Sequence, residues 1–172
     1  MFPTREDAGR QLAAHLLSFK RSRPVVLALP RGGVPVGIEI AKLLECPLDL
    51  VLVRKIGVPW QPELALAAIT DGGEPVVELN QDLVRALAIP PGYLAHEQAR
   101  ELKEIERRRA RYLGARPRVA VEGRTAIVVD DGIATGATVR AALRAVRRAR
   151  PARLVLAVPV APPEVVAALR HE

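Results

Sequence analysis

Two segments of the chain share one pattern, in which an apolar run is followed by a loop of small residues and then by helical periodicity. In the first segment, residues 25–29 precede Pro30-Arg31-Gly32-Gly33, and residues 34–45 have apolar side chains at helical spacing. In the second, residues 126–129 precede the loop 130–136 and another helical stretch. Such continuous apolar runs are typical of strands buried on both faces of a parallel sheet. Both loops are therefore expected at the carboxyl edge of one sheet, where sheets of this kind bind ligands.

The remaining apolar runs and the composition favour one α/β domain. Runs at 48–53 and 154–158 predict two more strands, so we expect a doubly wound, mostly parallel sheet. The 172 residues are 49% hydrophobic and 3% aromatic, which suits a single core of Val, Leu, Ile and Ala. We predict one domain over residues 1–172. Its C-terminal end is expected to be incomplete, because the chain stops within a predicted helix and one more strand would normally follow.

An insertion is expected between the two strand-helix units, at about residues 71–115. Asp71-Gly72-Gly73 lies between two apolar runs, which is typical of a small β-hairpin. Residues 94–113 have helical periodicity and are followed by a glycine, which predicts a long helix. A short amphipathic helix is predicted at residues 7–19 and could cover one side of the ligand edge.

Charge and composition exclude several classes of protein. The net charge of +7 suits an anionic partner, but much of it lies in Arg runs at helix ends, so nucleic acid and phosphorylated small molecules both stay open. The single Cys46 excludes an internal disulfide and a cysteine metal cluster. We expect no signal peptide and no membrane segment, because no apolar stretch reaches the roughly 20 residues that cross a bilayer. The expected location is cytoplasmic.

The most informative segment is the loop that follows residues 126–129. Asp130 and Asp131 accept hydrogen bonds, so they suit the hydroxyls of a ribose better than a phosphate, which they would repel. The next residues are small and open a helix, whose N-terminus offers free N–H donors to an anion. Carboxylates for a sugar beside a cradle for a phosphate describe a ribose 5-phosphate site. The predicted cradle consists of Ala134, Thr135, Gly136, Ala137 and Thr138.

The segment 128–138 resembles the 5-phosphoribosyl 1-pyrophosphate (PRPP) signature of type I phosphoribosyltransferases. Its Asp-Asp-x-x-Ala-Thr-Gly-x-Thr form is closest to that of adenine phosphoribosyltransferases, and the resemblance covers roughly residues 25–160. It implies attack of a nitrogen nucleophile on C1 of the ribose, with release of pyrophosphate. Magnesium is the implied cofactor and would arrive on the substrate, near Asp130 and Asp131 but not bound directly by them.

Two further segments resemble the pyrophosphate contacts of the family. Pro30-Arg31-Gly32-Gly33 is similar to a loop whose unusual backbone lets N–H groups face the pyrophosphate, and the implied contacts are Arg31, Gly32 and Gly33. Arg54-Lys55, at the end of the next strand, is similar to the basic contact to the same group, with Lys55 as the implied contact residue. A plain turn and an ordinary pair of surface cations remain the alternatives. The implied catalytic residues are Asp130, Asp131, Lys55 and Arg31.

Residues 57–63 lie where the family has a mobile flap that closes over the reacting centre. Gly57 suits a hinge, Trp60 could shield the site from water, and Glu63 belongs to the same predicted flap. A packed surface position for Trp60 is an equal alternative.

The acceptor is not set by the sequence. Residues 54–69 and the helix after Pro91 resemble a group of predicted phosphoribosyltransferases without a fixed acceptor. A nucleobase-like acceptor is implied, but Ala134 stands where hypoxanthine-guanine members have an acid, so a 6-oxopurine is less expected. Family members often form dimers, and nothing in the sequence sets the oligomeric state.

Two rival functions remain. One is a regulator that senses PRPP and binds nucleic acid, which only the positive charge supports, because no helix-turn-helix module or aromatic RNA platform is found. We therefore expect no nucleic-acid partner. The other is a nucleotide-binding α/β protein of another class, but the chain has neither Gly-x-x-x-x-Gly-Lys-[Ser/Thr] nor Gly-x-Gly-x-x-Gly.

Overall fold

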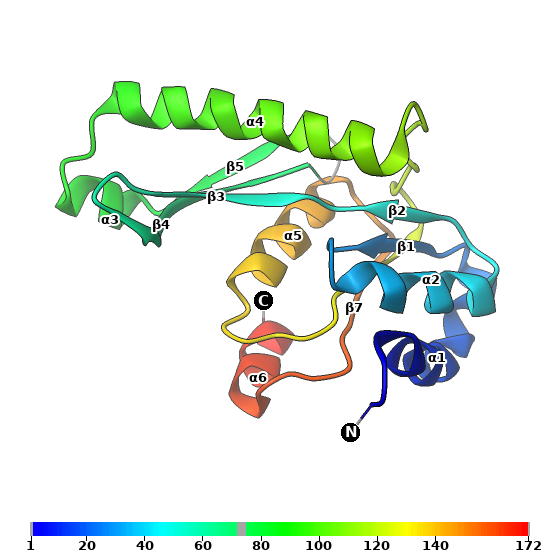
Figure 1. Cartoon of the computed structure of the whole chain (residues 1–172). Helices are drawn as coiled ribbons and strands as arrows, with labels where there is room; N and C mark the ends of the chain where they lie inside the picture. The colour runs from blue at the N-terminus through cyan, green and yellow to red at the C-terminus, as the bar shows by residue number, and fades with distance from the viewer. Residues whose placement is uncertain (1, 72–74, 172) are drawn as a thin grey trace.

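The structure, a computed structural model, describes residues 2–71 and 75–171 and contains two sheets (Figure 1). The main sheet has four parallel strands in the order β2-β1-β6-β7. These are β1 Val25–Ala28, β2 Leu48–Leu50, β6 Thr125–Val129 and β7 Arg153–Ala157. The second sheet is antiparallel and contains β3 Val53–Val58, β4 Gln61–Thr70 and β5 Val76–Leu79. The predicted α/β fold with a parallel sheet, a hairpin and a helical insertion is confirmed.

Helices cover both faces of the main sheet because its strands are apolar on both faces. On one face, Val26, Ile127 and Val129 pack against helices α1 Arg5–His15 and α2 Gly33–Leu44. The strand residues between them point the opposite way, since successive side chains of a strand alternate between faces. They pack against α5 Ala137–Arg148, and α6 Pro163–His171 contacts the same core from its partly buried side. A 3-10 helix, η1 Leu17–Ser22, connects α1 to β1.

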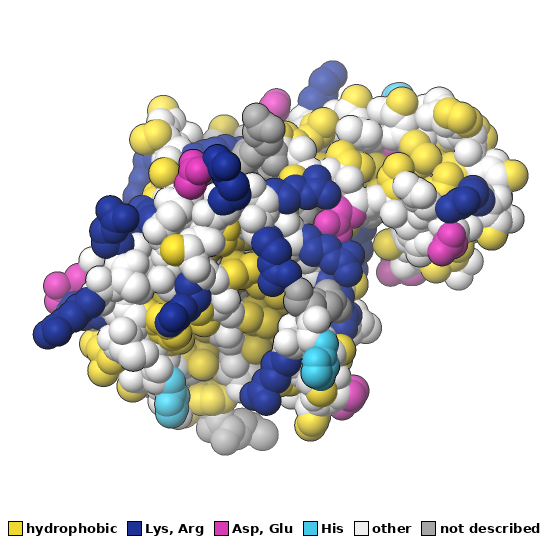
Figure 2. Space-filling view, turned by 180° about the vertical axis from the view of Figure 1, so that it is seen from behind, with side chains coloured by type: hydrophobic (Ala, Val, Ile, Leu, Met, Phe, Trp, Pro, Cys, Tyr) yellow, Lys and Arg dark blue, Asp and Glu magenta, His cyan; other side chains and the backbone are white. Residues whose placement is uncertain are grey.

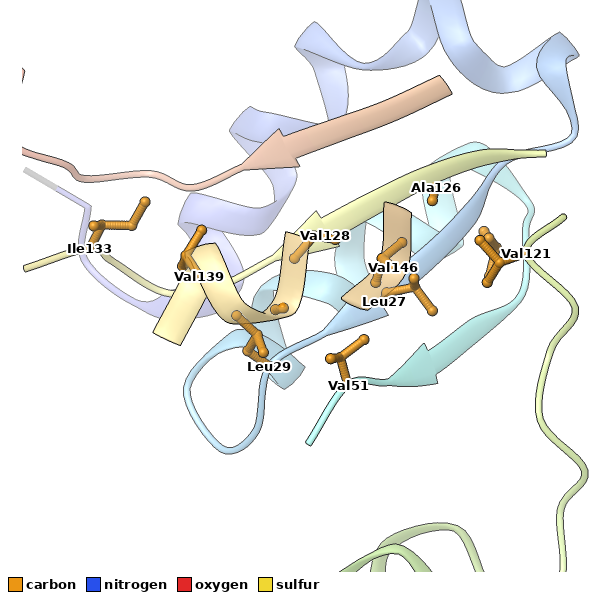
Figure 3. Close-up of a cluster of buried hydrophobic side chains, with 11 residues drawn as sticks. Leu27, Leu29, Val51, Val121, Ala126, Val128, Ile133, Val139 and Val146 are labelled. Carbon is orange, nitrogen blue, oxygen red and sulfur yellow. The ribbon is translucent and has the colours of Figure 1, made fainter. Parts of the chain in front are cut away.

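The core under α5 is built almost entirely from aliphatic side chains. Figure 3 shows Leu27 and Val128 of the sheet with Val139 and Val146 of α5 in one cluster. All four side chains are buried, and β6 is buried along its whole length. This packing fixes the end of β6 relative to the start of α5, which is where the acid pair and the small-residue loop lie.

The insertion forms an arm that extends from the main sheet and contains β3, β4, β5, α3 Gln81–Ala86 and α4 Pro91–Leu113 (Figure 1). Pro91 is well placed in the first turn of α4, where its missing N–H costs no hydrogen bond. The arm starts at β3, earlier than the residue 71 expected from sequence. The reason is that residues 61–70 form one long strand that pairs with β3 as well as with β5, and the local pattern revealed only the second hairpin.

A buried ion network joins the arm to the main sheet. Arg109 of α4 donates to both oxygens of Asp49 on β2, at 2.8 and 3.0 Å, and lies 3.5 Å from Asp71 Oδ2. Asp71 also accepts from the backbone N–H of Leu52 at 2.8 Å and pairs with Arg118 at 3.1 Å. Both carboxylates are buried, so this network holds α4 against the edge of the main sheet.

The free edge of β7 borders an apolar hollow. The hollow has a volume of about 510 Å³, and its wall includes Leu12 of α1, Leu154 and Leu156 of β7, and Leu169 of α6. Figure 2 shows it from behind as a patch of hydrophobic side chains bordered by basic ones. The additional strand expected beyond residue 172 stays a prediction. In the described ranges, no helix has the length and apolar character needed to span a membrane.

Candidate functional site

The end of β6 carries the two acids to the carboxyl edge of the main sheet. The Asp130 N–H donates to the Ala157 carbonyl of β7 at 3.4 Å, and the Asp131 N–H donates to the Asp130 carboxylate at 2.8 Å. Both side chains are partly exposed. Both acids are therefore at the carboxyl edge of the main sheet and within reach of solvent.

The loop after β1 lies against this acid pair. A Cβ on Gly32 would overlap the Asp131 carboxylate, and one on Gly33 would come within 2.5 Å of the Val129 carbonyl oxygen. At Gly33 only glycine allows such a close approach of two backbones, and at Gly32 the absence of a side chain leaves room for the Asp131 carboxylate. The Pro30–Arg31 peptide bond in this loop is cis. The two glycine-bearing loops that the sequence predicted at one sheet edge are thus in direct contact.

The residues between the acids and α5 form an open turn with unpaired backbone donors. The N–H groups of residues 134–138 donate to no backbone carbonyl in the described part of the chain. Gly136 ends the turn with a φ of 79° and is buried, while Ala134, Thr135 and Ala137 are exposed. A helix start of this kind, with free N–H groups open to solvent, binds anions. The arrangement can hold a phosphate a short distance from the two carboxylates.

The acid pair is electrostatically unusual. Burial, together with the negative charge of Asp131, raises the pKa of Asp130 from 3.8 to about 6. A hydroxyl-rich ligand that donates hydrogen bonds to the carboxylate would favour its charged form. Raised pKa values of this kind are common at binding and catalytic sites.

Arg5, in the first turn of α1, contacts the site and was missed by the sequence analysis. Its Nε donates to Asp131 Oδ2 at 2.7 Å, across 126 positions of the chain. The helix over residues 7–19 was expected to cover one side of the ligand edge, but no local pattern distinguished Arg5 from the other basic residues of the segment.

The predicted pyrophosphate residues are divided between two places. Gly32 and Gly33 lie against the acid-bearing strand, and Arg31 is exposed beside a cavity of about 410 Å³ that also touches the end of α4. Lys55 on β3 is exposed and lines a different cavity, of about 380 Å³, together with Ala137 at the start of α5. Its neighbour Arg54 is paired with Glu101 of α4 at 2.6 Å.

The predicted flap residues lie in the β3–β4 hairpin. Trp60 is in the turn, with 63% of its surface exposed, and Glu63 is exposed on β4. Gly57 accepts a hydrogen bond from the Tyr93 hydroxyl at 2.8 Å, which ties the hairpin to α4. The turn lies toward the far end of the arm (Figure 1). A flap function for Gly57, Trp60 and Glu63 stays a prediction.

The described residues offer no preformed metal cage. Across residues 2–71 and 75–171, no three His, Cys, Asp or Glu side chains are grouped so that they could hold a metal ion. Asp130 and Asp131 are the carboxylates placed beside the candidate phosphate cradle.

Comparison with known proteins identifies the family. The phosphoribosyl transferase domain matches residues 3–171 of the chain. Two Mycobacterium tuberculosis proteins, "Putative phosphoribosyl transferase Rv0571c" of strain H37Rv and MT0597 of strain CDC 1551, are each 47% identical over 167 residues. That alignment covers 97% of this chain but only 37% of each of those proteins.

Solved structures agree with this assignment. The crystal structure of TT1426 from Thermus thermophilus is 45% identical, with a TM-score of 0.81, and the match covers 100% of this chain and 81% of that one. A purine phosphoribosyltransferase from Pyrococcus horikoshii has a TM-score of 0.52 over 92% of this chain and 74% of its own, and at 16% identity that likeness concerns the fold. The family match over residues 3–171 and the shared parallel sheet lead to one conclusion: the chain belongs to the type I phosphoribosyltransferase family.

Proposed function

We propose that this chain transfers the phosphoribosyl group of PRPP to a nitrogen acceptor of the nucleobase kind, with magnesium and with release of pyrophosphate. The observation that carries the proposal is the combination of Asp130 and Asp131 with the N–H groups of residues 134–138, which have no backbone acceptor among the described residues. Carboxylates can hold the ribose hydroxyls while the helix start holds the 5-phosphate. Membership of a transferase family agrees with this reading.

The chemistry of the transfer is mainly a matter of charge. Pyrophosphate leaves with several negative charges, which the Arg31 guanidinium and the backbone N–H group of Gly32 are suited to stabilise, whereas the Gly33 N–H already donates to the Leu29 carbonyl at 2.9 Å. Asp130 and Asp131 would orient the ribose and favour positive charge that develops at its C1 atom. Preorganised donors of this kind are worth about 2.7–4 kcal/mol each where they have been removed from other enzymes.

Magnesium fits this site as a substrate-borne ion. It keeps much of its hydration and is usually bound through one or two carboxylates and substrate phosphates rather than by a protein cage. Asp130 and Asp131 could accept hydrogen bonds from its waters. When bound, the ion would neutralise pyrophosphate charge. Lys55 lines a cavity together with Ala137 at the start of α5, so in this proposal its ammonium group attracts the substrate from the side of the 5-phosphate.

The chain spans 37% of the length of its curated mycobacterial relatives, so activities located elsewhere in such proteins lie outside it.

Two measurements test the proposal. Calorimetric titration with PRPP and magnesium should give saturable binding that the double variant Asp130→Asn/Asp131→Asn loses while keeping its far-UV circular dichroism. Asp82→Asn is the control, because that carboxylate is exposed on α3 and 98% accessible. Unchanged affinity in the double variant would remove the two acids from the site.

The second measurement separates enzyme from regulator. Pyrophosphate release is assayed across purines, pyrimidines and simple amines in the presence of PRPP. Release with at least one acceptor is expected. Binding of PRPP without release from any acceptor, together with salt-dependent binding to nucleic acid, would instead support a sensing regulator.

A further inference from the structure

A cavity of about 620 Å³ lies between the N-terminal segment and the loop after β7. Phe2 and Arg5 form one side of it, Pro159 and Val160 form another, and Asp131 reaches it from the candidate ribose site. None of Arg31, Gly32 and Gly33 lines this cavity. The cavity and Gly32 of the predicted pyrophosphate loop thus both reach the Asp131 carboxylate, while the lining of the cavity is separate from that loop.

Arg5 is the cation of this cavity, and the start of α1 that carries it is held by capping and close packing. Thr4 caps α1 by accepting from the Asp7 N–H at 3.1 Å, and a Cβ on Gly9 would come within 2.8 Å of the Val36 carbonyl, so α1 packs closely on α2. Arg5 uses Nε to bond Asp131 Oδ2. Within the described residues, its two terminal nitrogens have no hydrogen-bond partner, and they carry four further N–H donors.

The other walls restrict what the cavity can bind. Three of the lining residues have polar side chains: Arg5, Asp131 and Thr4. The Thr4 hydroxyl already donates a hydrogen bond to the Asp7 carboxylate at 2.9 Å. The remaining lining residues, including Phe2, Val36 and Val160, are apolar. Such a cavity suits a flat, largely apolar ring with one group that accepts hydrogen bonds from a guanidinium. A carboxylate matches the planar fork of arginine best, because it can accept two parallel bonds with charge assistance.

We propose that this cavity is the acceptor site and that Arg5 selects nitrogen-containing ring acceptors that carry a carboxylate. The inference rests on the proposed phosphoribosyl transfer. In that reaction, the acceptor nitrogen supplies the electron pair for the bond to C1, while the C1–O bond breaks and its pair leaves with pyrophosphate. A proton on the attacking nitrogen passes to water. The nucleophile approaches C1 opposite the leaving group, so the acceptor and pyrophosphate need separate places, and Arg31, Gly32 and Gly33 are not among the residues that line this cavity.

The test uses nucleotides that differ in one carboxylate and so needs no turnover. Orotidine 5′-monophosphate is compared with uridine 5′-monophosphate, and nicotinate mononucleotide with nicotinamide mononucleotide, by calorimetric titration. Ribose 5-phosphate measures the sugar site alone. We expect the carboxylated member of at least one pair to bind tenfold or more tightly than its partner.

Variants assign that preference to Arg5. Arg5→Gln should reduce the carboxylate preference to less than threefold, and a ratio is used because loss of the Arg5–Asp131 contact can alter sugar binding in both members of a pair. Arg10→Gln is the matched control, because Arg10 lies further along α1 and does not line the cavity. It should keep the full preference. Val160→Trp, which fills the cavity, should weaken all four nucleotides tenfold or more and leave ribose 5-phosphate within threefold.

The outcomes separate the two proposals. Ribose 5-phosphate or PRPP binding without any carboxylate preference, or a preference that survives in Arg5→Gln, overturns the acceptor assignment and leaves the sugar site standing. Absence of binding to both PRPP and ribose 5-phosphate overturns the proposed function, and the acceptor site falls with it.

Discussion

The Asp131 carboxylate lies directly against Gly32, so that a Cβ on Gly32 would overlap its oxygens. The loop after β1 and the loop after β6 are thus in contact through one glycine and one acid. Because the overlap involves both carboxylate oxygens, a side chain at this position must displace the acid or the loop.

Gly32→Ala is therefore expected to weaken binding of PRPP with magnesium by at least tenfold, because Asp131 moves away from the ribose. Calorimetric titration measures the effect. Gly92→Ala serves as the control, since a Cβ on Gly92 meets no atom within 4 Å, and it should bind as the wild type does. Equal affinity in Gly32→Ala would show that the contact does not position Asp131.

Binding of the sugar should depend on pH through Asp130. Burial and the nearby Asp131 charge raise the pKa of Asp130 to about 6, and its carboxylate is the better acceptor of ribose hydroxyl bonds. Affinity for ribose 5-phosphate should therefore increase as the pH rises through about 6. Calorimetry at pH 5, 6 and 7.5 measures this affinity. In Asp130→Asn, the rise in affinity near pH 6 that is due to Asp130 should be absent. If the affinity of the variant rises with pH as that of the wild type does, the pH dependence comes from another titrating group.

The same pKa predicts an effect on stability. The unfolded chain loses the Asp130 proton near pH 3.8 and the folded chain near 6, so the folded state binds more protons between these values. Deprotonation therefore destabilises the fold as the pH rises through that window. At pH 7.5, Asp130→Asn should unfold at a higher temperature than the wild type, and at pH 4 the difference should shrink. Calorimetric melting at both pH values tests the sign.

Gly136 is the glycine whose backbone conformation shapes the candidate phosphate cradle. Its φ of 79° is strained for other residues, and an added Cβ would come within 2.9 Å of Val165 Cγ1. Gly136→Ala should cost about 1–2 kcal/mol of unfolding free energy. It should also weaken ribose 5-phosphate binding, because the N–H groups of residues 134–138 would be reoriented. Urea denaturation and titration measure the two effects, and loss of stability with full affinity would contradict the cradle.

Arg109 holds two buried carboxylates, so its loss should be costly. Arg109→Leu leaves the buried Asp49 carboxylate with two backbone N–H donors but no cation, and it removes one of the two arginines beside Asp71. Breaking a buried pair in this way costs about 3–5 kcal/mol. Burial already raises the pKa of Asp71, and loss of Arg109 should raise it further, so the destabilisation should be larger at pH 8 than at pH 5. Urea unfolding at both pH values measures this.

Arg107→Leu is the matched control for that experiment. Arg107 lies on the same helix but pairs with Glu104 on the surface, where an ion pair is worth about 1 kcal/mol or less. If the two variants had equal unfolding free energies, the buried network would not be what fixes the arm.

The sequence by itself determined the two strand-loop-helix units and the parallel sheet, and it predicted the chemistry of the loop at residues 130–138. Each of these depends on neighbouring residues: an apolar run predicts a buried strand, adjacent acids mark its end, and small residues before a helix predict an anion site. The glycines at positions 32 and 33 could be singled out for the same reason, although their contact with β6 could not.

Only the tertiary structure decided which distant residues share the site. The Arg5–Asp131 bond joins positions 126 residues apart. Lys55 lies on β3, one of the three strands of the arm that form one antiparallel sheet, and lines a cavity together with residues of α5. The arm in turn is held by Arg109 and two acids that come from β2 and from the end of β4. Long-range pairs of this kind leave no local pattern, because their energy depends on how the elements pack and not on the spacing of residues along the chain.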